Sequence, residues 1–339
     1  MASLKDIAKQ CKVSVATVSK ALNDHTDISP ETKSLILETA KEMGYHPNSQ
    51  ARALKTNRTY NLGVLFADES RSGLTHDYFA SVLDSFKRTA EALGYDITFI
   101  NNSSPKNMSY LEHTRYRGFD GVVLACIDFY DPAVSELLHS ELPIVTIDHV
   151  FSDHTSICSD NFGGMRGLTE YIRSKGHKKI AYIYGDDTSV TKNRLNGFQS
   201  VIDQSGQPVE KEYILPSHYR NPEDAFRLTK HLLSLSRRPT CIIYPDDYSC
   251  IGGINALTEE GLRIPEDMSI AGYDGQFLSQ IVSPKLTTYA QATSEIGKTA
   301  AYRLIQLIEN PRPAVPEHVV VSGRVVEGES VASLISYTG

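Results

Sequence analysis

Apolar residues in the first 46 positions recur at helical spacing, interrupted by capping and turn residues. Ser14 is a favourable N-cap for a second helix; Ser29-Pro30 is a favourable start for a third, which Gly44 ends. The core positions of the three predicted helices are Leu4, Ile7, Ala8 and Cys11, then Val18, Ala21 and Leu22, then Leu35, Ile36, Ala40 and Met43. Residues 1–46 therefore predict a small all-α helix-turn-helix head, the layout that places one helix in a DNA major groove.

The second predicted helix leaves an unusual set of residues facing outward. An exposed valine beside an exposed alanine is uncommon on a surface helix. This arrangement is explained if Val15 and Ala16 contact thymine methyl groups and base edges while Lys20 binds a guanine or a phosphate. The alternative is that Val15 closes the small core of the head, and base contact is the favoured interpretation. The residues expected to contact DNA here are Ser14, Val15, Ala16, Thr17, Ser19, Lys20 and Asn23.

A short helical segment follows at 49–54 and ends in an apolar residue, Leu54. Its length is far below the ~12–15 residues that an isolated helix needs in water, so we expect a coil in the free protein. Residues 47–59 are therefore predicted to be a hinge helix and a polar linker.

From residue 60 onward, short β-rich runs alternate with amphipathic helices. The predicted strands are 62–66, 97–100, 121–124 and 144–147, followed by 180–184, 241–244, 269–273 and 287–289. Alternating βα units predict parallel sheets covered on both faces, and two sets predict two Rossmann-like lobes with a cleft between them. The last apolar helix, near 296–308, is expected to return to the first lobe. Residues 60–339 then form a two-lobed α/β domain, with lobe one at about 60–160 plus 291–320 and lobe two at about 161–290 plus 321–339.

Composition narrows the class of protein. The N-terminus lacks the apolar region of a signal peptide and no run reaches 18 apolar residues, so a cytoplasmic protein with no membrane contact is expected. The five cysteines and eleven histidines lack metal-ligand spacing, so no metal site is expected. Residues 1–58 carry nine Lys/Arg and six Asp/Glu, whereas the rest of the chain has a net charge of −10. A basic head on an acidic body fits DNA contact by the head alone.

Catalytic motifs are missing from the sequence. It contains no P-loop, no G-x-S-x-G and no H-E-x-x-H, and Gly163-Gly164 lacks the spacing of a dinucleotide-binding loop. Neither an enzyme nor a cofactor is predicted.

Motifs along nearly the whole chain resemble the lactose/galactose repressor (LacI) family. In the head they are D-I-A, V-S-x-A-T-V-S-x-x-L-N, S-P-E-T and G-Y-x-P-N. In the body they are G-H-K-K-I-A at 176–181, R-L-N-G-F at 194–198, I-P-E-D at 264–267, G-Y-D at 272–274 and L-T-T at 286–288. Lys12 stands at the turn where the family often has glycine, so we expect a lysine in a left-handed turn there. The resemblance implies that residues 60–339 are the effector-binding and dimerisation domain, with the fold of periplasmic sugar-binding proteins.

The resemblance also implies how the hinge binds DNA. In the family, two hinge helices pair across a homodimer and lie in the minor groove, where each inserts a leucine into the central base step. This role falls on Leu54, and an apolar wedge of this kind kinks the duplex. The alternative is that Leu54 packs against the next domain. The hinge residues expected to contact DNA are Asn48, Ala51, Arg52, Leu54 and Lys55.

Acidic residues gather where the predicted strands end, which is where open α/β sheets bind ligands. They are Asp68, Glu69, Asp148, Asp246, Asp247 and Asp274, and they suit a polyhydroxylated ligand whose hydroxyls donate hydrogen bonds. The resemblance assigns ligand contacts to Asp148, Arg194, Asp246 and Asp274. Asp246 replaces a common asparagine, which favours an all-hydroxyl ligand. Because the chain has no tryptophan, stacking is assigned to Tyr78, Phe79 or Tyr219, although a core role for Phe79 is slightly favoured. Thr293 stands where some members have an aromatic residue.

Together these features predict a homodimeric repressor of carbohydrate-utilisation genes. It would bind a pseudo-palindromic double-stranded operator and leave it when a sugar enters the interlobe cleft. The alternative effectors are a purine or nucleoside, a sugar phosphate, or a phosphoprotein co-repressor. A solute-binding transport protein would share the body but would lack the head.

Overall fold

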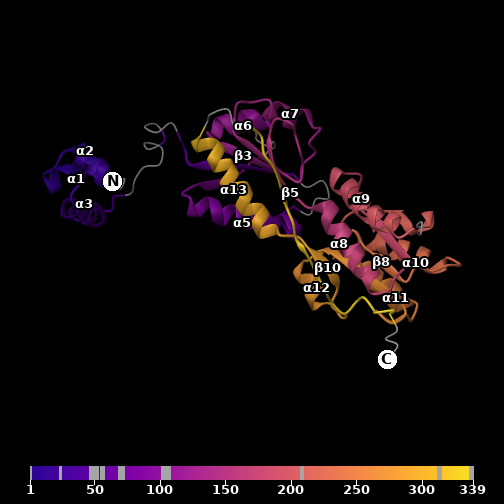
Figure 1. The fold of residues 1–339 in the computed structure, drawn as a ribbon. Helices are drawn as coiled ribbons and strands as arrows, with labels where there is room; N and C mark the ends of the chain where they lie inside the picture. Colours follow the sequence, from indigo (N-terminus) through magenta and orange to yellow (C-terminus); the bar gives the residue numbers. More distant parts are fainter. Residues whose placement is uncertain are drawn as a thin grey trace. The chain divides into compact units, whose positions relative to one another are not determined.

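The computed structural model describes residues 2–22, 25–45, 53, 58–67, 73–100, 108–206, 210–310 and 315–335. The chain divides into two compact units, Met1–Thr59 and Tyr60–Gly339. The described part of the smaller unit is helical, and the larger unit is α/β (Figure 1). No helix in the described ranges is long and apolar enough to cross a membrane.

Three helices form the head: Leu4–Cys11 (α1), Val15–Leu22 (α2) and Pro30–Glu42 (α3). Ser3 and Asp6 form a capping box at the start of α1, and Ser29 caps α3 just before Pro30. The left-handed turn after α1 falls on Lys12, with φ 54° and ψ 39°, as the sequence predicted. The buried core of the head consists of Ile7, Ala8, Val18, Ala21, Ile36 and Ala40.

One predicted core position of the head is wrong. Leu35 is 49% exposed, whereas Ile36 and Ala40 are buried. Ile36, Ala40 and Met43 already form a stripe at i, i+4 and i+7 along α3. Leu35 precedes this stripe by one residue and is therefore turned by about 100° toward solvent.

The first lobe of the larger unit is built on a six-stranded sheet of order β11-β5-β4-β3-β1-β2, in which every neighbouring pair is parallel. Its strands are Asn61–Phe66 (β1), Asp96–Phe99 (β2), Gly121–Ala125 (β3), Ile144–Ile147 (β4), Thr155–Ser159 (β5) and His318–Val321 (β11). Its helices are Asp77–Ala92 (α5), Tyr110–Arg117 (α6), Pro132–Leu138 (α7) and Thr293–Glu309 (α13). Val123 of β3 packs with α5 and α13, whereas Val122 packs with α6 and α7. Burial on both faces explains the unbroken apolar run of this strand.

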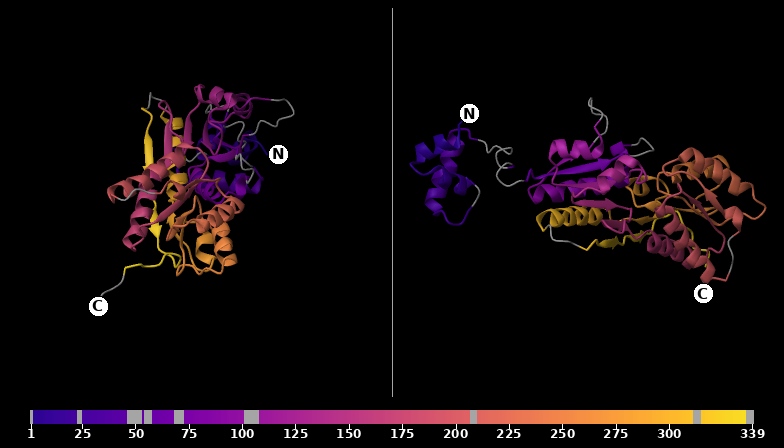
Figure 2. Two further views of the ribbon diagram at one scale, coloured as in Figure 1. Left: turned by 90° about the vertical axis from the view of Figure 1, so that its right-hand side faces the viewer. Right: turned by 90° about the horizontal axis from the view of Figure 1, so that it is seen from above.

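The second lobe repeats this plan with a sheet of order β12-β10-β9-β8-β6-β7, in which only β12 is antiparallel to its neighbour. Its strands are Ile180–Tyr184 (β6), Ile214–Pro216 (β7), Cys241–Ile243 (β8), Ser269–Asp274 (β9), Thr287–Ala290 (β10) and Arg324–Val326 (β12). The helices Asn161–Ser174 (α8) and Ser189–Gln204 (α9) cover one face. The helices Pro222–Ser234 (α10) and Cys250–Glu259 (α11) cover the other (Figure 2). Short helical turns lie at Gly73–Thr75 (η1), Lys211–Tyr213 (η2) and Phe277–Ile281 (α12).

Glycines set the distance between paired helices in both lobes. A Cβ at Gly197 of α9 would lie 2.3 Å from the carbonyl oxygen of Phe162 in α8. A Cβ at Gly297 of α13 would lie 2.1 Å from the carbonyl oxygen of Val82 in α5. Any larger residue at either position would push the two helix backbones apart.

The chain passes between the lobes three times. β5 leads into α8, β10 leads into α13, and β11 leads into β12 (Figure 1). These passages lie side by side: the amide of Asp160 donates to the carbonyl of Val321 at 3.0 Å, and the amide of Gly323 donates to the Tyr289 hydroxyl at 2.6 Å. The prediction that the last helix returns to the first lobe is confirmed, since Ile296 and Leu304 are buried in the core of that lobe.

Candidate functional sites

The outward face of α2 is the candidate DNA-reading surface of the head. Ser14 caps α2 by accepting from the Thr17 amide at 3.0 Å, as predicted. Val18 and Ala21 are buried against the other two helices. Val15 is 41% exposed, which contradicts the alternative that it closes the small core. Of the other predicted residues, Ala16 and Lys20 are exposed, and Thr17 and Ser19 are half-buried.

Lys20 forms an ion pair with Asp27, which lies beyond the end of α2. A DNA phosphate would have to replace this carboxylate as the partner of the ammonium group. Several predicted residues lie outside the described part of the chain: Asn23, Asn48, Ala51, Arg52, Leu54, Lys55, Asp68 and Glu69.

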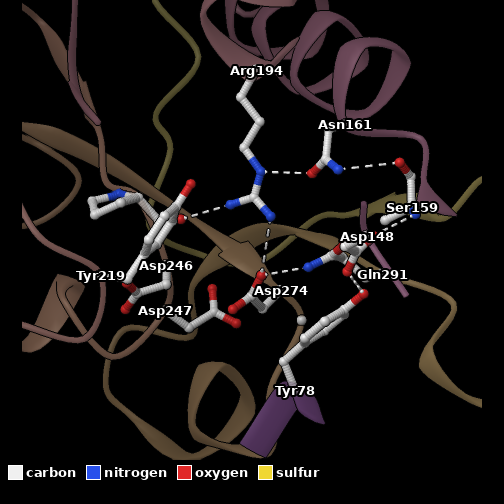
Figure 3. A network of polar contacts seen from close by, with 12 residues as sticks. Tyr78, Asp148, Ser159, Asn161, Arg194, Tyr219, Asp246, Asp247, Asp274 and Gln291 are labelled. Atoms are coloured by element: carbon white, nitrogen blue, oxygen red, sulfur yellow. Dashed lines mark hydrogen bonds and ion pairs between the residues drawn. The ribbon is translucent and has the colours of Figure 1, made fainter. Parts of the chain in front are cut away.

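In the larger unit, the centre of the candidate site is Arg194, which is 4% exposed on α9. Its Nε donates to Oδ1 of Asn161 at 2.9 Å and its Nη1 donates to the carbonyl of Pro245 at 3.1 Å. Its Nη2 lies 3.7 Å from Oδ1 of Asp274 (Figure 3). The guanidinium also stacks 3.7 Å from the ring centre of Tyr273. Because Gly197 lets α9 approach α8 closely, the guanidinium reaches Asn161 in the first turn of α8.

The first lobe contributes Asp148, which follows β4, and Tyr78 on α5. The Tyr78 hydroxyl donates to Oδ2 of Asp148 at 2.5 Å, and the amide of Ser159 donates to Oδ1 at 2.8 Å (Figure 3). The phenol of Tyr78 is therefore a hydrogen-bonding group that orients Asp148. Its ring is buried. Stacking of this ring on a ligand stays a prediction.

Asp274 ends β9 and links the second lobe to the passage after β10. Nε2 of Gln291 donates to Oδ1 of Asp274 at 2.6 Å. Among the described residues, the hydrogen bonds and ion pairs of this carboxylate use Oδ1, so Oδ2 can accept a further hydrogen bond. Thr293 is half-buried at the first residue of α13, two positions beyond Gln291.

Backbone strain is concentrated at the same place. Six described residues other than glycine have positive φ, and three of them are Asp148 (57°), Arg220 (53°) and Asp274 (101°). Such conformations cost of order 1–3 kcal/mol each and tend to cluster at binding and catalytic sites. Their coincidence here supports a functional role for this cluster.

Asp246 accepts hydrogen bonds from two backbone amides and so holds the loop before α10 in place. Its Oδ2 accepts from the amide of Arg220 at 2.7 Å, and its Oδ1 accepts from the amide of Ser249 at 2.7 Å. The side chain is 2% exposed. The adjacent Asp247 is fully buried and accepts from the Thr288 hydroxyl at 2.6 Å and the Gln276 amide at 2.7 Å. Both carboxylates thus hold the loops that surround the cluster.

Two further aromatic residues were expected to stack on a ligand. Tyr219 lies with its ring against Gly185, where a Cβ would come within 2.5 Å, and with the Arg194 guanidinium 5.6 Å from its ring centre. Its hydroxyl is 2.7 Å from that of Thr191, which fixes the orientation of the ring. Phe79 packs against the core of the first lobe with Phe66, at 5.6 Å between ring centres, which agrees with the favoured core role.

Burial dominates the electrostatics of the site. It raises the pKa of Asp148, Asp246 and Asp274 above the ordinary value of a carboxyl group, and raises the pKa of Asp247 most strongly. The nearby Arg194 charge lowers the pKa of Asp148 and Asp274 and partly opposes this effect. With Asp148 and Asp274 beside the Arg194 guanidinium, the cluster offers a ligand both hydrogen-bond acceptors and a charged donor. In the described ranges, no group of three or more His, Cys, Asp or Glu residues could hold a metal ion.

The structure brings Tyr78, Asp148, Arg194, Tyr219, Asp246 and Asp274 together, and adds residues that the sequence did not reveal. Asn161 and Gln291 position the charged groups, and both are more than 90% buried. Oε1 of Gln291 and Oγ of Ser159 are buried without a hydrogen-bond partner in the part of the chain that is described. Buried polar atoms of this kind normally bind a ligand or an ordered water. Asn161 lies two residues beyond the end of β5, a strand that the sequence pattern did not predict, so no strand-end signal pointed to it.

Comparisons with known proteins agree with this architecture. The model of the bacterial regulatory proteins of the lacI family matches residues 3–48, and that of a periplasmic binding protein-like domain matches residues 169–331. The HTH-type transcriptional repressor PurR of Mannheimia succiniciproducens is 31% identical over 98% of this chain and 100% of its own. PurR of Escherichia coli O1:K1 is 30% identical over 98% of this chain and 97% of its own.

Solved structures share the fold. The lac repressor dimer bound to operator and the anti-inducer ONPF has a TM-score of 0.80 at 23% identity, covering 98% of this chain and 99% of that one. A LacI family transcriptional regulator from Enterococcus faecium with bound ribose has a TM-score of 0.69 at 26% identity, covering 81% and 100%. A complex of the regulator CelR with cellobiose has a TM-score of 0.70 at 22% identity, covering 97% and 100%.

The head, the two-lobed body and these relatives define a helix-turn-helix transcriptional regulator with a periplasmic-binding-like domain, and not an enzyme. The chain belongs to the LacI family and is a DNA-binding transcriptional repressor.

Proposed function

We propose that this repressor controls carbohydrate-utilisation genes and that its effector is a neutral sugar bound between the two lobes. The supporting observation is the convergence of Asp148 from the first lobe and Asp274 from the second around Arg194. These groups accept and donate hydrogen bonds as sugar hydroxyls require. The unpartnered Oγ of Ser159 and Oε1 of Gln291 lie beside the same two carboxylates.

A purine is the second candidate effector. The relatives that are about 30% identical are named PurR, and the aromatic ring of Tyr219, which lies beside Arg194, could stack on a base. The surplus of carboxyl groups favours the sugar over a sugar phosphate, since a phosphate would need several basic partners.

DNA binding is assigned to the outward face of α2, where Val15 and Ala16 would contact base edges and Lys20 a phosphate. In a homodimer, two such helices would read the halves of a pseudo-palindromic operator. Leu54 and Arg52 would bind the minor groove between them. Effector binding would bring the lobes together, shift the dimer interface and separate the two hinges, so operator affinity would fall.

The test is thermal unfolding of the full chain with mono- and disaccharides, sugar phosphates and purines. A ligand at 100 times its Kd stabilises the native state by about 2.7 kcal/mol, which raises the Tm by several degrees. A shift with a sugar supports the proposal. A shift confined to purines or to phosphates would overturn it.

Two variants localise any shift to the cluster. Arg194→Gln should abolish the shift. Arg166→Gln, which alters an exposed pair with Glu170 on α8, should retain it. If Arg194→Gln does not fold, Tyr78→Phe provides a milder change on the opposite lobe. Retention of the full shift by both site variants would contradict binding at this cluster.

A further inference from the structure

Among the described residues, one ion pair joins the two lobes. Nη1 of Arg220, which precedes α10 in the second lobe, lies 3.3 Å from Oδ2 of Asp77 at the start of α5 in the first lobe. Nη2 of Arg220 also donates to the carbonyl oxygen of Thr75 at 3.3 Å. The other ion pairs described in this unit join groups within one lobe.

Arg220 is held in place by contacts that do not involve Asp77. Its backbone has φ 53°, a left-handed conformation that costs an arginine roughly 1–2 kcal/mol. Asp246 fixes this conformation by accepting from the Arg220 amide, and the guanidinium lies 4.7 Å from the ring centre of Tyr248. The second lobe therefore presents a preoriented cation to the first lobe, because Asp246 and Tyr248 fix both ends of the residue.

Each partner in this ion pair is adjacent in sequence to a residue of the polar cluster around Arg194, the proposed effector site. Asp77 precedes Tyr78, which donates to Asp148. Arg220 follows Tyr219, whose ring lies beside Arg194. Any rotation that separates the lobes would break the pair and draw Tyr78 away from Tyr219.

We propose that Arg220 and Asp77 form a latch that stabilises the conformation with the lobes together and so positions Tyr78 and Tyr219 on the effector. The part of this inference that concerns ligand affinity rests on the proposed function. The effect of the latch on lobe opening does not depend on any effector.

The latch predicts that binding of an uncharged effector depends on salt. Closing the lobes forms an ion pair that the ligand does not supply, and salt screens such a pair. The Asp77 side chain is 54% exposed and that of Arg220 is 16% exposed, so the effect is modest. We expect the affinity for a sugar found in the panel to fall about two- to fivefold between 50 and 500 mM NaCl.

The first experiment compares sugar affinity in the full chain and its variants at both salt concentrations. Asp77→Asn and Arg220→Gln should each weaken binding about two- to fivefold at low salt and remove most of the salt dependence. The double variant should be no weaker than Arg220→Gln alone, since the ion pair that Asp77→Asn removes is already lost in Arg220→Gln. The matched controls are Asp84→Asn and Arg88→Gln, which alter an exposed pair on α5 itself and should behave as wild type. Wild-type affinity in either latch variant would overturn the proposal.

The second experiment needs no effector. In hydrogen–deuterium exchange of the ligand-free full chain, Asp77→Asn should speed exchange in residues 217–222 of the opposite lobe, whereas Asp84→Asn should not. An effect confined to α5 would contradict the latch, because loss of a favourable charge at a helix N-terminus acts locally. If no sugar shifts the Tm, the proposed effector class fails while this measurement still decides the latch.

Discussion

Oδ1 of Asn161 accepts a hydrogen bond from Nε of Arg194 at 2.9 Å, which joins the first turn of α8 to the middle of α9. Both side chains are more than 90% buried. A guanidinium buried in this way loses its hydrogen bonds to water, and acceptors in the protein must replace them. The amide of Asn161 is thus part of what allows a guanidinium to lie inside the second lobe.

Replacing Asn161 with alanine should therefore destabilise the protein by about 1–3 kcal/mol, because the buried guanidinium loses an acceptor. Urea unfolding of the full chain measures this change. The control is Asn196→Ala, at an exposed position of α9, which should change the free energy of unfolding by less than about 0.5 kcal/mol. Equal effects of the two changes would contradict the importance of this hydrogen bond.

Gly197 should tolerate no side chain. In Gly197→Ala the new Cβ meets the Phe162 carbonyl oxygen, so we expect a loss of about 1–3 kcal/mol or more and weaker effector binding as Arg194 moves away from Asn161. Gly167→Ala on α8 is the matched comparison. Its Cβ would meet no atom within 4 Å, and we expect a gain approaching 1 kcal/mol in the free energy of unfolding. Thermal unfolding of both variants shows whether the opposite signs hold.

Val15 should contribute to operator affinity and not to the stability of the head. Val15→Ser changes an exposed residue, so stability should stay within about 0.5 kcal/mol of wild type. The affinity for operator should fall by about 1–3 kcal/mol if the valine contacts a base, as measured by fluorescence anisotropy with operator and unrelated duplexes. Val18→Ser, at a fully buried position, should instead lower the Tm. Unchanged operator affinity in Val15→Ser would rule out the base contact.

Asp247 should make stability depend on pH. Burial raises the pKa of its carboxyl in the folded state well above that in the unfolded chain. Its contribution to stability is therefore fully present below the unfolded pKa and is lost as pH rises through the folded pKa. Asp247→Asn removes this titration, although it also weakens the contacts with Thr288 and Gln276.

The free energy of unfolding of Asp247→Asn, relative to wild type, should consequently rise with pH by at most about 1.4 kcal/mol per unit. Urea unfolding between pH 5 and pH 8 provides the comparison. Parallel curves for the two proteins would show that the Asp247 carboxyl is already ionised in the folded protein at pH 5, which would contradict a strongly raised pKa.

The sequence predicted the interior of the fold better than its edges. Strands such as β3 and β6 are apolar throughout because both faces are covered, and their boundaries agree to within a residue. The strands β5, β7, β11 and β12 were not predicted from the sequence. β5 contains serine and threonine, β7 has three residues and ends in proline, and β11 and β12 are edge strands at the ends of the two sheets.

At the site, too, residues with a clear sequence signal could be predicted, whereas residues placed by tertiary contacts could not. Asp148 and Asp274 could be predicted because they follow strands, and Arg194 because it lies in a family motif. Asn161 and Gln291 carry no charge, and their positions depend on a close helix approach and on a passage between the lobes. The role of Asp246 was also hidden, since its hydrogen bonds to Arg220 and Ser249 depend on how its loop folds back.

The passages between the lobes also have a consequence for biosynthesis. β11 ends at Val321 and β12 begins at Arg324, yet they complete different sheets. Neither lobe can finish its sheet until the ribosome has made almost the entire chain. A premature stop after β10 would leave both lobes with an unpaired strand edge, which is a template for aggregation. A nascent copy of this repressor should therefore depend on chaperones until its final residues emerge.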